Sequence, residues 1–296
     1  MPALPSTMSG GRSGTSMISF QDATGLNPTQ KIVHLGANPI DGDPPYSGLM
    51  RTGSADVVGF EPNPEALAKL NAQKGARELY LPHAVGDGQR HTLNLCFASG
   101  MTSLLTPNPD VLGLFHGFPL WGKVVTTEEL DTVRLDDVPE TEGVTLLVMD
   151  IQGSELMALR SAELRLRDAL VLHLEVCFMQ LYKDQPLFSE VELFLRDHGF
   201  VLHKFAHQVS RVIQPMVIDN SIHKGLSQLV WGDAVFIRDF SSHASLTDAQ
   251  LLAMGAILHE CYASVDVVHH LLATYDRRHA TRMAPDYVVS LGQLAA

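Results

Sequence analysis

Two short segments of the sequence, separated by about one strand and one helix, carry residue types that suit a nucleoside ligand. The apolar run Lys31-Ile-Val-His-Leu35 leads into a turn at Gly36, and the run Val57-Val-Gly-Phe60 leads into Glu61. Glycine lets a ligand approach the main chain, and a carboxylate at a strand end can accept hydrogen bonds from both hydroxyl groups of a ribose. These segments therefore predict two neighbouring parallel strands whose ends bind a nucleoside cofactor.

Two more carboxylates end apolar runs further along the chain. Asp150 follows Val144-Thr-Leu-Leu-Val-Met149, and Glu175 follows Ala169-Leu-Val-Leu-His-Leu174. Nearly continuous apolar runs are typical of central parallel strands, whose axes lie about 4.8 Å apart. We expect both side chains to converge over the cofactor, where they could take a proton from a hydroxyl group or bind a divalent cation through oxygen. The competing interpretation is that Asp150 holds the following turn and Glu175 caps a helix.

The segments between these runs predict the elements that position them. Residues 64–73 read as a helix with Asn63 as its N-cap and Pro64 at its first position. Helical patterns also follow Gly153 and Phe188, so strands and helices alternate along the chain. This alternation predicts a doubly wound α/β sheet.

The ends of the chain differ in character from the middle. Residues 1–29 are rich in Ser, Thr, Gly and Pro without sustained periodicity, which predicts a flexible leader. After Ser245, Thr247 and Gln250 form a capping box, and apolar residues recur near helical spacing. The C-terminal part is expected to be one long helix or two shorter ones, which pack on the parent domain or form a homodimer.

The composition excludes several classes of protein. Thirty-three acidic residues against 21 lysines and arginines give a formal net charge of −12, which argues against general nucleic-acid binding. No apolar run reaches the roughly 20 residues that cross a bilayer, and the N-terminus lacks a secretory signal pattern. The three cysteines have no metal-binding spacing, so buried reduced thiols are expected. We therefore expect a cytoplasmic protein without a membrane partner.

Five short motifs occur in an order that resembles the FkbM family of S-adenosylmethionine-dependent methyltransferases. The motifs are Gly36-Ala-Asn38, Phe60-Glu-Pro-Asn-Pro64, Ala84-Val-Gly-Asp87, Leu135-Asp-Asp137 and Asp150-Ile-Gln-Gly-Ser-Glu155. The resemblance spans roughly residues 31–240. It implies a class I methyltransferase (Rossmann-like) sheet of seven strands, whose last strand, at residues 234–238, is antiparallel. It also implies methylation of a hydroxyl group on a sugar or another small molecule.

The resemblance further implies a role for each motif. The expected domains are a leader at 1–29, the methyltransferase domain at 30–240 and a helical extension at 241–296. Gly36 and Asn38 would lie near the methionine part of the cofactor, Glu61 on the ribose, and Asp150 with Gln152 beside the sulfonium and the acceptor. The expected cofactor-binding set is Gly36, Ala37, Asn38, Glu61, Pro62, Asn63, Ala84, Val85, Asp87, Asp150 and Gln152, in which Ala84, Val85 and Asp87 border the adenine. Asp150 and Glu175 are the expected catalytic pair and, in the metal version, the cation ligands.

The sequence departs from the family where the first strand usually ends in an acidic residue two positions before the glycine. Here that position is His34, so a cationic cofactor loses a nearby carboxylate. Tyr46, which follows two prolines, and His207 are predicted to contact a small-molecule substrate. Two alternatives stay open: a catalytically silent cofactor-binding module of the same fold, and a nicotinamide-dependent oxidoreductase, although the first turn lacks G-x-G-x-x-G.

Overall fold

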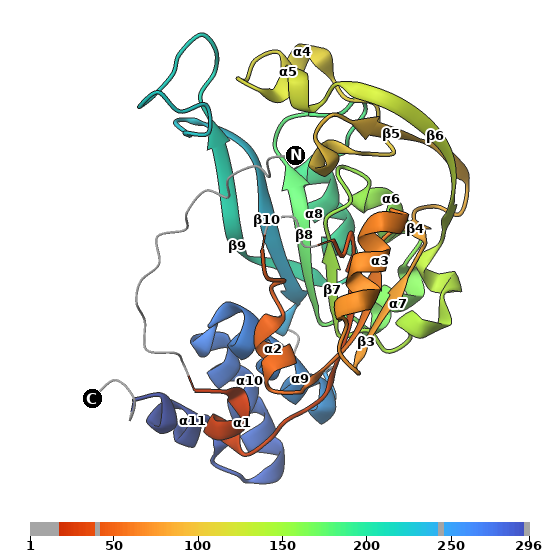
Figure 1. The fold of residues 1–296 in the computed structure, drawn as a ribbon. Helices are drawn as coiled ribbons and strands as arrows, with labels where there is room; N and C mark the ends of the chain where they lie inside the picture. Colours follow the sequence, from red (N-terminus) through yellow and green to blue (C-terminus); the bar gives the residue numbers. More distant parts are fainter. Residues whose placement is uncertain (1–17, 39–41, 242–245, 293–296) are drawn as a thin grey trace. The chain divides into compact units, whose positions relative to one another are not determined.

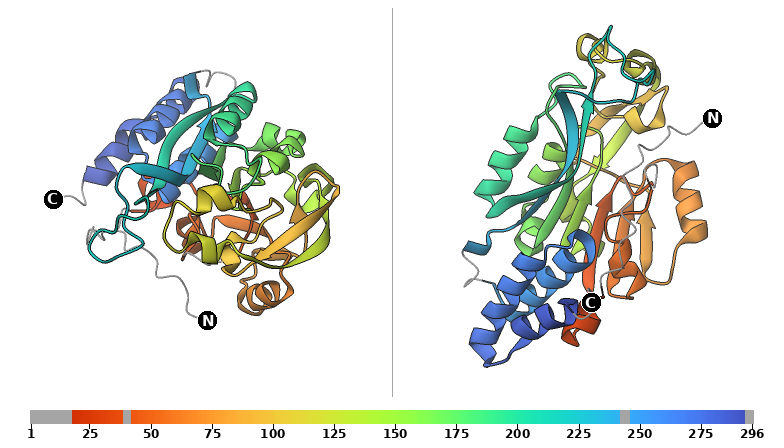
Figure 2. Two further views of the ribbon diagram at one scale, coloured as in Figure 1. Left: turned by 90° about the horizontal axis from the view of Figure 1, so that it is seen from above. Right: turned by 90° about the vertical axis from the view of Figure 1, so that its left-hand side faces the viewer.

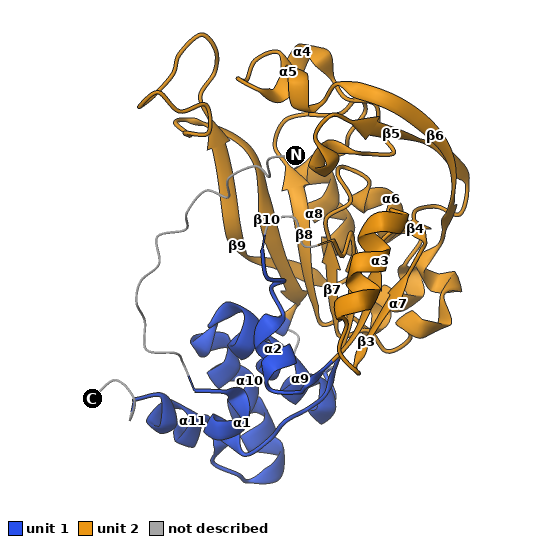
Figure 3. Cartoon of the chain, viewed as in Figure 1, with its two compact units in different colours: residues 1–30, 39–55, 240–296 blue, residues 31–38, 56–239 orange. Residues whose placement is uncertain are grey.

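The computed structural model describes residues 18–38, 42–241 and 246–292, which fall into two compact units (Figure 3). The sheet unit consists of residues 31–38 and 56–239. The helical unit combines residues 1–30, 39–55 and 240–296. Residues 39–55, which the sequence assigns to the methyltransferase domain, thus cluster with the C-terminal helices.

A seven-stranded sheet forms the centre of the sheet unit, with the order β3-β2-β1-β7-β8-β10-β9 (Figure 1). β1 pairs in parallel with β7, and β7 with β8, whereas β10 runs antiparallel to both β8 and β9. The predicted doubly wound sheet with an antiparallel last strand is therefore confirmed. The strands are β1 (Gln30–Leu35), β2 (Ala55–Phe60), β3 (Glu78–Leu81), β7 (Leu146–Met149), β8 (Val171–Cys177), β9 (Phe200–Arg211) and β10 (Gln228–Arg238).

Helices α6 (Glu155–Arg160), α7 (Glu163–Asp168) and α8 (Phe188–Asp197) cover one face of this sheet (Figure 2). Alternate strand residues, such as Leu35, Met149 and Leu174, point to that face and share one buried core with the helices. Every residue of β7 is buried, as expected for a central parallel strand. The core therefore fixes the ends of β1, β7 and β8 relative to one another.

Helix α3 (Pro64–Gln73) begins as the sequence predicts. The side-chain oxygen of Asn63 accepts hydrogen bonds from the backbone N–H groups of Glu65 and Ala66, and Pro64 occupies the first turn. Two 3₁₀ turns, η2 (Leu135–Asp137) and η3 (Pro139–Thr141), precede β7.

A small second sheet has the order β4-β6-β5. Its strands are β4 (Ala84–Val85), β5 (Arg90–Cys96) and β6 (Val124–Val133), and the chain between β5 and β6 forms η1 (Ser99–Met101), α4 (Pro109–Leu112) and α5 (Phe118–Trp121). Buried Leu112, Phe115 and Phe118 form a second core together with Tyr182. This core ties the segment after β8 to the segment after β5.

The helical unit contains α1 (Phe20–Thr24), α2 (Ser47–Arg51), α9 (Asp248–Tyr262), α10 (Val265–His279) and α11 (Met283–Gly292). The C-terminal part thus holds three helices, not one or two. The C-cap residues that follow α9 and α10 are Ala263 and Ala280, and both have a left-handed backbone. Because alanine is a strong helix former, the sequence carries no stop signal at either position.

The last third of the segment predicted as a flexible leader contains α1, and residues 1–17 lie outside the described residues. Ser19 caps α1 through a hydrogen bond from the Asp22 amide, and the Phe20 side chain is 2% exposed. The Phe20 amide donates to Glu260 Oε1 on α9 at 2.6 Å. Long-range burial of one phenylalanine orders a segment whose own composition favours disorder.

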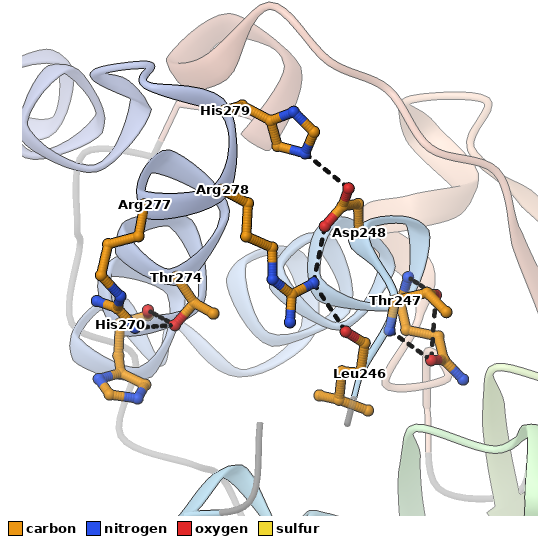
Figure 4. A network of polar contacts seen from close by, with 9 residues as sticks. Leu246, Thr247, Asp248, His270, Thr274, Arg277, Arg278 and His279 are labelled. Carbon is orange, nitrogen blue, oxygen red and sulfur yellow. Dashed lines mark hydrogen bonds and ion pairs between the residues drawn. The ribbon is translucent and has the colours of Figure 1, made fainter. Parts of the chain in front are cut away.

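α9 and α10 form an antiparallel hairpin whose open end is held by ion pairs (Figure 4). Arg278 Nη1 lies 2.7 Å from Asp248 Oδ1, and His279 Nε2 lies 2.6 Å from Asp248 Oδ2. Arg278 also donates to the Leu246 carbonyl oxygen. Hydrogen bonds from Arg278 and His279 lower the pKa of Asp248. The Thr247–Gln250 capping box at this helix start is confirmed.

Candidate functional site

The strand order reverses between β1 and β7, because β2 and β3 continue from β1 to one side and β8 continues from β7 to the other. In open α/β sheets, ligands bind outside the carboxyl ends of the strands at such a switch point. Gly36–Asn38 follow β1 here, and Asp150 follows β7. The topology alone therefore brings two of the predicted motifs together at a ligand-binding position.

The backbone segments at this edge of the sheet lie close together and are hydrogen-bonded to one another. The amides of Gly36 and Ala37 donate to the Phe60 carbonyl oxygen at 3.1 and 3.0 Å, and the Asp150 amide donates to the Leu35 carbonyl oxygen at 3.1 Å. Gly36 has φ +78°, and a Cβ atom there would lie 2.1 Å from the Asp150 carbonyl oxygen. Gly36 is thus required for the approach of the two strand ends, not only for ligand access.

Glu61 lies directly after β2 and is 7% exposed. Its Oε1 accepts a hydrogen bond from the Asn63 amide at 2.8 Å, and its carboxylate also accepts one from the Asn38 amide. Burial raises the pKa of Glu61, although these two backbone hydrogen bonds oppose the shift. The carboxylate therefore links the turns that follow β1 and β2.

The other members of the predicted cofactor set have more local roles. Asn63 is exposed and its side chain caps α3, and Pro62 is partly exposed beside it. Ala84 and Val85 form β4, and Asp87 follows them. Burial opposes ionisation of Asp87, but hydrogen bonds from His91 Nε2 at 2.7 Å and from the Gln89 amide at 2.9 Å lower its pKa.

Asp150 takes part in a chain of side-chain hydrogen bonds. Gln152 Nε2 donates to Asp150 Oδ1 at 2.6 Å, and the Tyr182 hydroxyl donates to Gln152 Oε1 at 3.1 Å. Ser103 Oγ donates to the Gln152 carbonyl oxygen at 2.6 Å. Gln152, predicted to border the sulfonium, therefore bridges an aspartate and a tyrosine that lie 32 positions apart in the sequence.

Glu155 closes the turn that carries these residues. Its Oε1 accepts hydrogen bonds from the amides of Ile151 at 2.9 Å and Gly153 at 3.3 Å. The side chain is 5% exposed. Burial raises the pKa of Glu155 to about 7 against these hydrogen bonds, and the charge of Asp150 adds to the rise.

Glu175 lies on the strand next to β7, as predicted. Met149 pairs with Leu174, so the next positions along the two strands, Asp150 and Glu175, are level with each other. Burial raises the pKa of Tyr182, and the negative charges of Glu175 and Asp150 raise it further. β8 continues past Glu175 to Cys177, so the prediction that this strand ends on Glu175 is wrong, and the convergence of the two carboxylates over the cofactor stays a prediction.

The two predicted substrate contacts lie in different parts of the chain. His207 is exposed on β9 and pairs with Asp233 of β10, which in turn pairs with Glu175. Tyr46 belongs to the helical unit, where it occupies the N-cap position of α2 and is 2% exposed. For both residues the contact with a substrate stays a prediction.

The predicted cation site finds no support. Within residues 18–38, 42–241 and 246–292, no group of three or more His, Cys, Asp or Glu side chains could hold a metal ion. A pocket of about 330 Å³ in the sheet unit is lined by His83 and Gly88, which flank the predicted adenine segment 84–87, but no residue of the predicted site itself lines it.

Sequence reasoning identifies Ser103 and Tyr182 only as possible substrate or cofactor contacts by their loop positions, not as the residues that hold Gln152 in place. Ser103 and Tyr182 come from separate loops, and no spacing links either residue to Gln152. Glu155 had a visible signal, since it follows Gly153 in the first turn of a helix, but that position predicts a favourable helix-dipole interaction. Its hydrogen bonds to two amides before the helix become visible only in the structure.

Comparison with known proteins adds the chemical context. A family model described as the methyltransferase FkbM domain matches residues 34–202. No curated protein matches the sequence significantly. No helix of the described ranges is long and apolar enough to cross a membrane.

Three solved structures resemble parts of the chain, at low scores. A protein from Thermoplasma acidophilum proposed to be a methyltransferase has a TM-score of 0.35 and 9% identity over 73% of this chain and 70% of its own. An uncharacterized protein from Listeria monocytogenes has a TM-score of 0.35 and 7% identity over 93% and 97%. A SAM-dependent methyltransferase from Aquifex aeolicus has a TM-score of 0.30 and 13% identity over 72% and 84%.

Proposed function

Because the chain belongs to the FkbM methyltransferase family, we propose that it transfers a methyl group from S-adenosylmethionine to a hydroxyl group of a sugar or another small polar metabolite. The observation that carries this proposal is the meeting of three features where the strand order reverses: the Gly36 turn, the buried Glu61 carboxylate and Asp150. All three lie within the residues that match the family model.

The residues present fit the cofactor. Glu61 is held by two backbone amides at the end of β2, the position from which a carboxylate binds a ribose diol. The backbone of Gly36–Asn38 would lie along the methionine part, and Ala84, Val85 and Asp87 would border the adenine. When bound, S-adenosylmethionine supplies an electrophilic methyl group on a cationic sulfur.

The chain's own task is then to hold the acceptor in line and to remove its proton. Orientation of two reactants can supply several kcal/mol of the barrier, about 7–11 kcal/mol in the most favourable systems. Asp150 and Glu175, level on adjacent strands, are the carboxylates proposed to receive the hydroxyl proton as the new oxygen–carbon bond forms. Such general-base assistance typically contributes about 10²- to 10⁴-fold in rate.

Replacing Glu61 with glutamine is expected to weaken binding of S-adenosylhomocysteine by about ten- to a hundredfold, because a hydrogen bond to a charged group contributes about 1.5–3 kcal/mol. Glutamine preserves the side-chain volume, which matters because Glu61 is buried and bonded to two backbone amides. Calorimetric titration checks this, with exposed Glu65→Gln on α3 as the control. Unchanged affinity in E61Q would show that the ribose lies elsewhere.

Replacing Asp150 with asparagine is expected to lower turnover at least tenfold more than it lowers affinity for S-adenosylhomocysteine. Asparagine keeps the size of the side chain but cannot accept a proton at neutral pH. The measurement is release of S-adenosylhomocysteine with a panel of sugars and small polyols. Equal losses of turnover and affinity would argue against a role in proton removal.

The silent-module alternative rests on His34. Burial and, to a smaller extent, nearby His173 together lower the pKa of His34 to about 3, so this histidine is neutral and does not replace a carboxylate. Cofactor binding without turnover on a broad acceptor panel would favour this alternative. A cytoplasmic location and dimerisation through α9, α10 and α11 remain predictions.

A further inference from the structure

We propose that Glu155 and Tyr182 are positioning residues that act through Gln152 to hold the Asp150 carboxylate toward the cofactor's sulfonium. This inference rests on the proposed function, because it takes the sulfonium to lie beside Asp150. Neither residue belongs to the expected cofactor-binding set or to the expected catalytic pair. Both are almost fully buried, with 5% of Glu155 and 1% of Tyr182 exposed. Their effect on a ligand therefore passes through Gln152 and Asp150.

The backbone of the Asp150–Gly153 turn is held by Glu155. Gln152 has φ +55° and Gly153 has φ +95°, and a non-glycine residue adopts a left-handed backbone only at some energetic cost. Glu155 Oε1 accepts the amides on either side of Gln152, those of Ile151 and Gly153. A single carboxylate oxygen of Glu155 therefore holds the backbone on both sides of Gln152.

The Gln152 side chain is hydrogen-bonded at both ends of its amide group. Its amide group has two different ends, and each meets a matching partner: Nε2 donates to Asp150 Oδ1, and Oε1 accepts from the Tyr182 hydroxyl. Turning the amide over would bring two acceptors together at Asp150. The Asp150 carboxylate therefore selects the end of Gln152 that faces it, and the Tyr182 hydroxyl, which also lies 3.2 Å from the Met101 carbonyl oxygen, holds the other end of the amide in place.

Tyr182 is itself held in place by its backbone and by its ring. Its backbone forms an isolated β-bridge with Pro107, its amide donates to Gln185 Oε1 at 3.2 Å, and its ring belongs to the second core of the sheet unit. Ser103, which follows η1, donates a hydrogen bond from its hydroxyl group to the Gln152 carbonyl oxygen. Asp150 is thus oriented by a rigid shell, whereas a free aspartate side chain would sample several rotamers.

The orientation of Asp150 can be tested without knowing the methyl acceptor. S-adenosylmethionine carries a methyl group on a positive sulfur, whereas S-adenosylhomocysteine lacks that methyl group and carries a neutral sulfur, and the rest of the two ligands is the same. A carboxylate held toward the sulfur favours the charged ligand, and the attraction falls as the distance grows. The ratio of the two dissociation constants therefore reports on how Asp150 is held.

The test is calorimetric titration of both ligands at pH 8 with the full chain and four variants. Tyr182→Phe and Glu155→Ala are expected to reduce the preference for S-adenosylmethionine over S-adenosylhomocysteine by about threefold. Glu155→Gln keeps an oxygen that can accept both amides, so it should restore most of the preference. Tyr80→Phe removes a hydroxyl that donates to Glu78 on β3 and is the matched control, expected to leave the ratio unchanged.

Each remaining outcome has a defined meaning. Equal weakening of both ligands in Tyr182→Phe would overturn the proposal, because a purely structural role would not distinguish a charged from a neutral sulfur. Unchanged affinity for both ligands in Tyr182→Phe would also overturn it, even if Glu155→Ala fails to fold. If the unaltered protein binds neither ligand, the proposed function itself is wrong, and this result is distinct from the other two.

Discussion

Replacing Gly36 with alanine is expected to destabilise the protein by about 4 kcal/mol or more, a loss typical of a severe local clash in a buried site. The added Cβ would lie 2.1 Å from the Asp150 carbonyl oxygen, which is backbone and cannot rotate away. Relief requires separating the ends of β1 and β7, at the cost of the Asp150–Leu35 hydrogen bond. The measurement is the free energy of unfolding in urea.

A matched control separates the clash from the backbone conformation. Gly143 has φ +73°, close to the +78° of Gly36, but a Cβ atom there would meet no atom within 4 Å. Gly143→Ala should therefore cost only the left-handed conformation, about 1–2 kcal/mol. If Gly36→Ala proves no more destabilising than Gly143→Ala, the close approach of the two strand ends is wrong.

Glu155 is expected to make stability depend on pH. Burial raises its pKa from 4.5 in the unfolded chain to about 7 in the folded protein. The folded state therefore favours the protonated form, so this contribution to stability is fully present below about pH 4.5 and is lost as the pH rises through about 7. A shift of this size corresponds to about 3 kcal/mol in full.

The Glu155→Gln variant isolates that contribution because glutamine does not titrate. Relative to the unaltered protein, the variant should gain about 2 kcal/mol in free energy of unfolding between pH 5.5 and pH 8.5, the part of the transition within this range. Urea unfolding of both proteins in the same series of buffers provides the measurement. A difference that stays constant across this range would mean that Glu155 ionises as readily in the folded protein as in the unfolded chain.

Much of the sheet is predictable because its signals are local. Continuous apolar runs mark β7 and β8, and the Asn63-Pro64 pair marks the start of α3, since each feature depends on neighbouring residues alone. Local signals also place Glu61 and Asp150 at strand ends. Their common location then follows from the order of strands in a doubly wound sheet.

Other parts of the structure depend on contacts between residues that lie far apart in the sequence. The ordering of α1 depends on the burial of Phe20 and on Glu260, which lies 240 positions later. The hydrogen bonds from Tyr182 and Ser103 to Gln152 likewise span 30 and 49 positions. No periodicity or motif encodes such pairs, so sequence patterns identify Asp150 and Gln152 but not the residues that hold them.

The most direct test of the central claim is calorimetric titration of the purified full chain with S-adenosylhomocysteine, with NAD as the competing nucleoside ligand. The account predicts saturable binding of S-adenosylhomocysteine that weakens in Glu61→Gln, and no comparable binding of NAD. Absence of S-adenosylhomocysteine binding, or preferential binding of NAD, would contradict the assignment of this strand edge as a methyl-donor site.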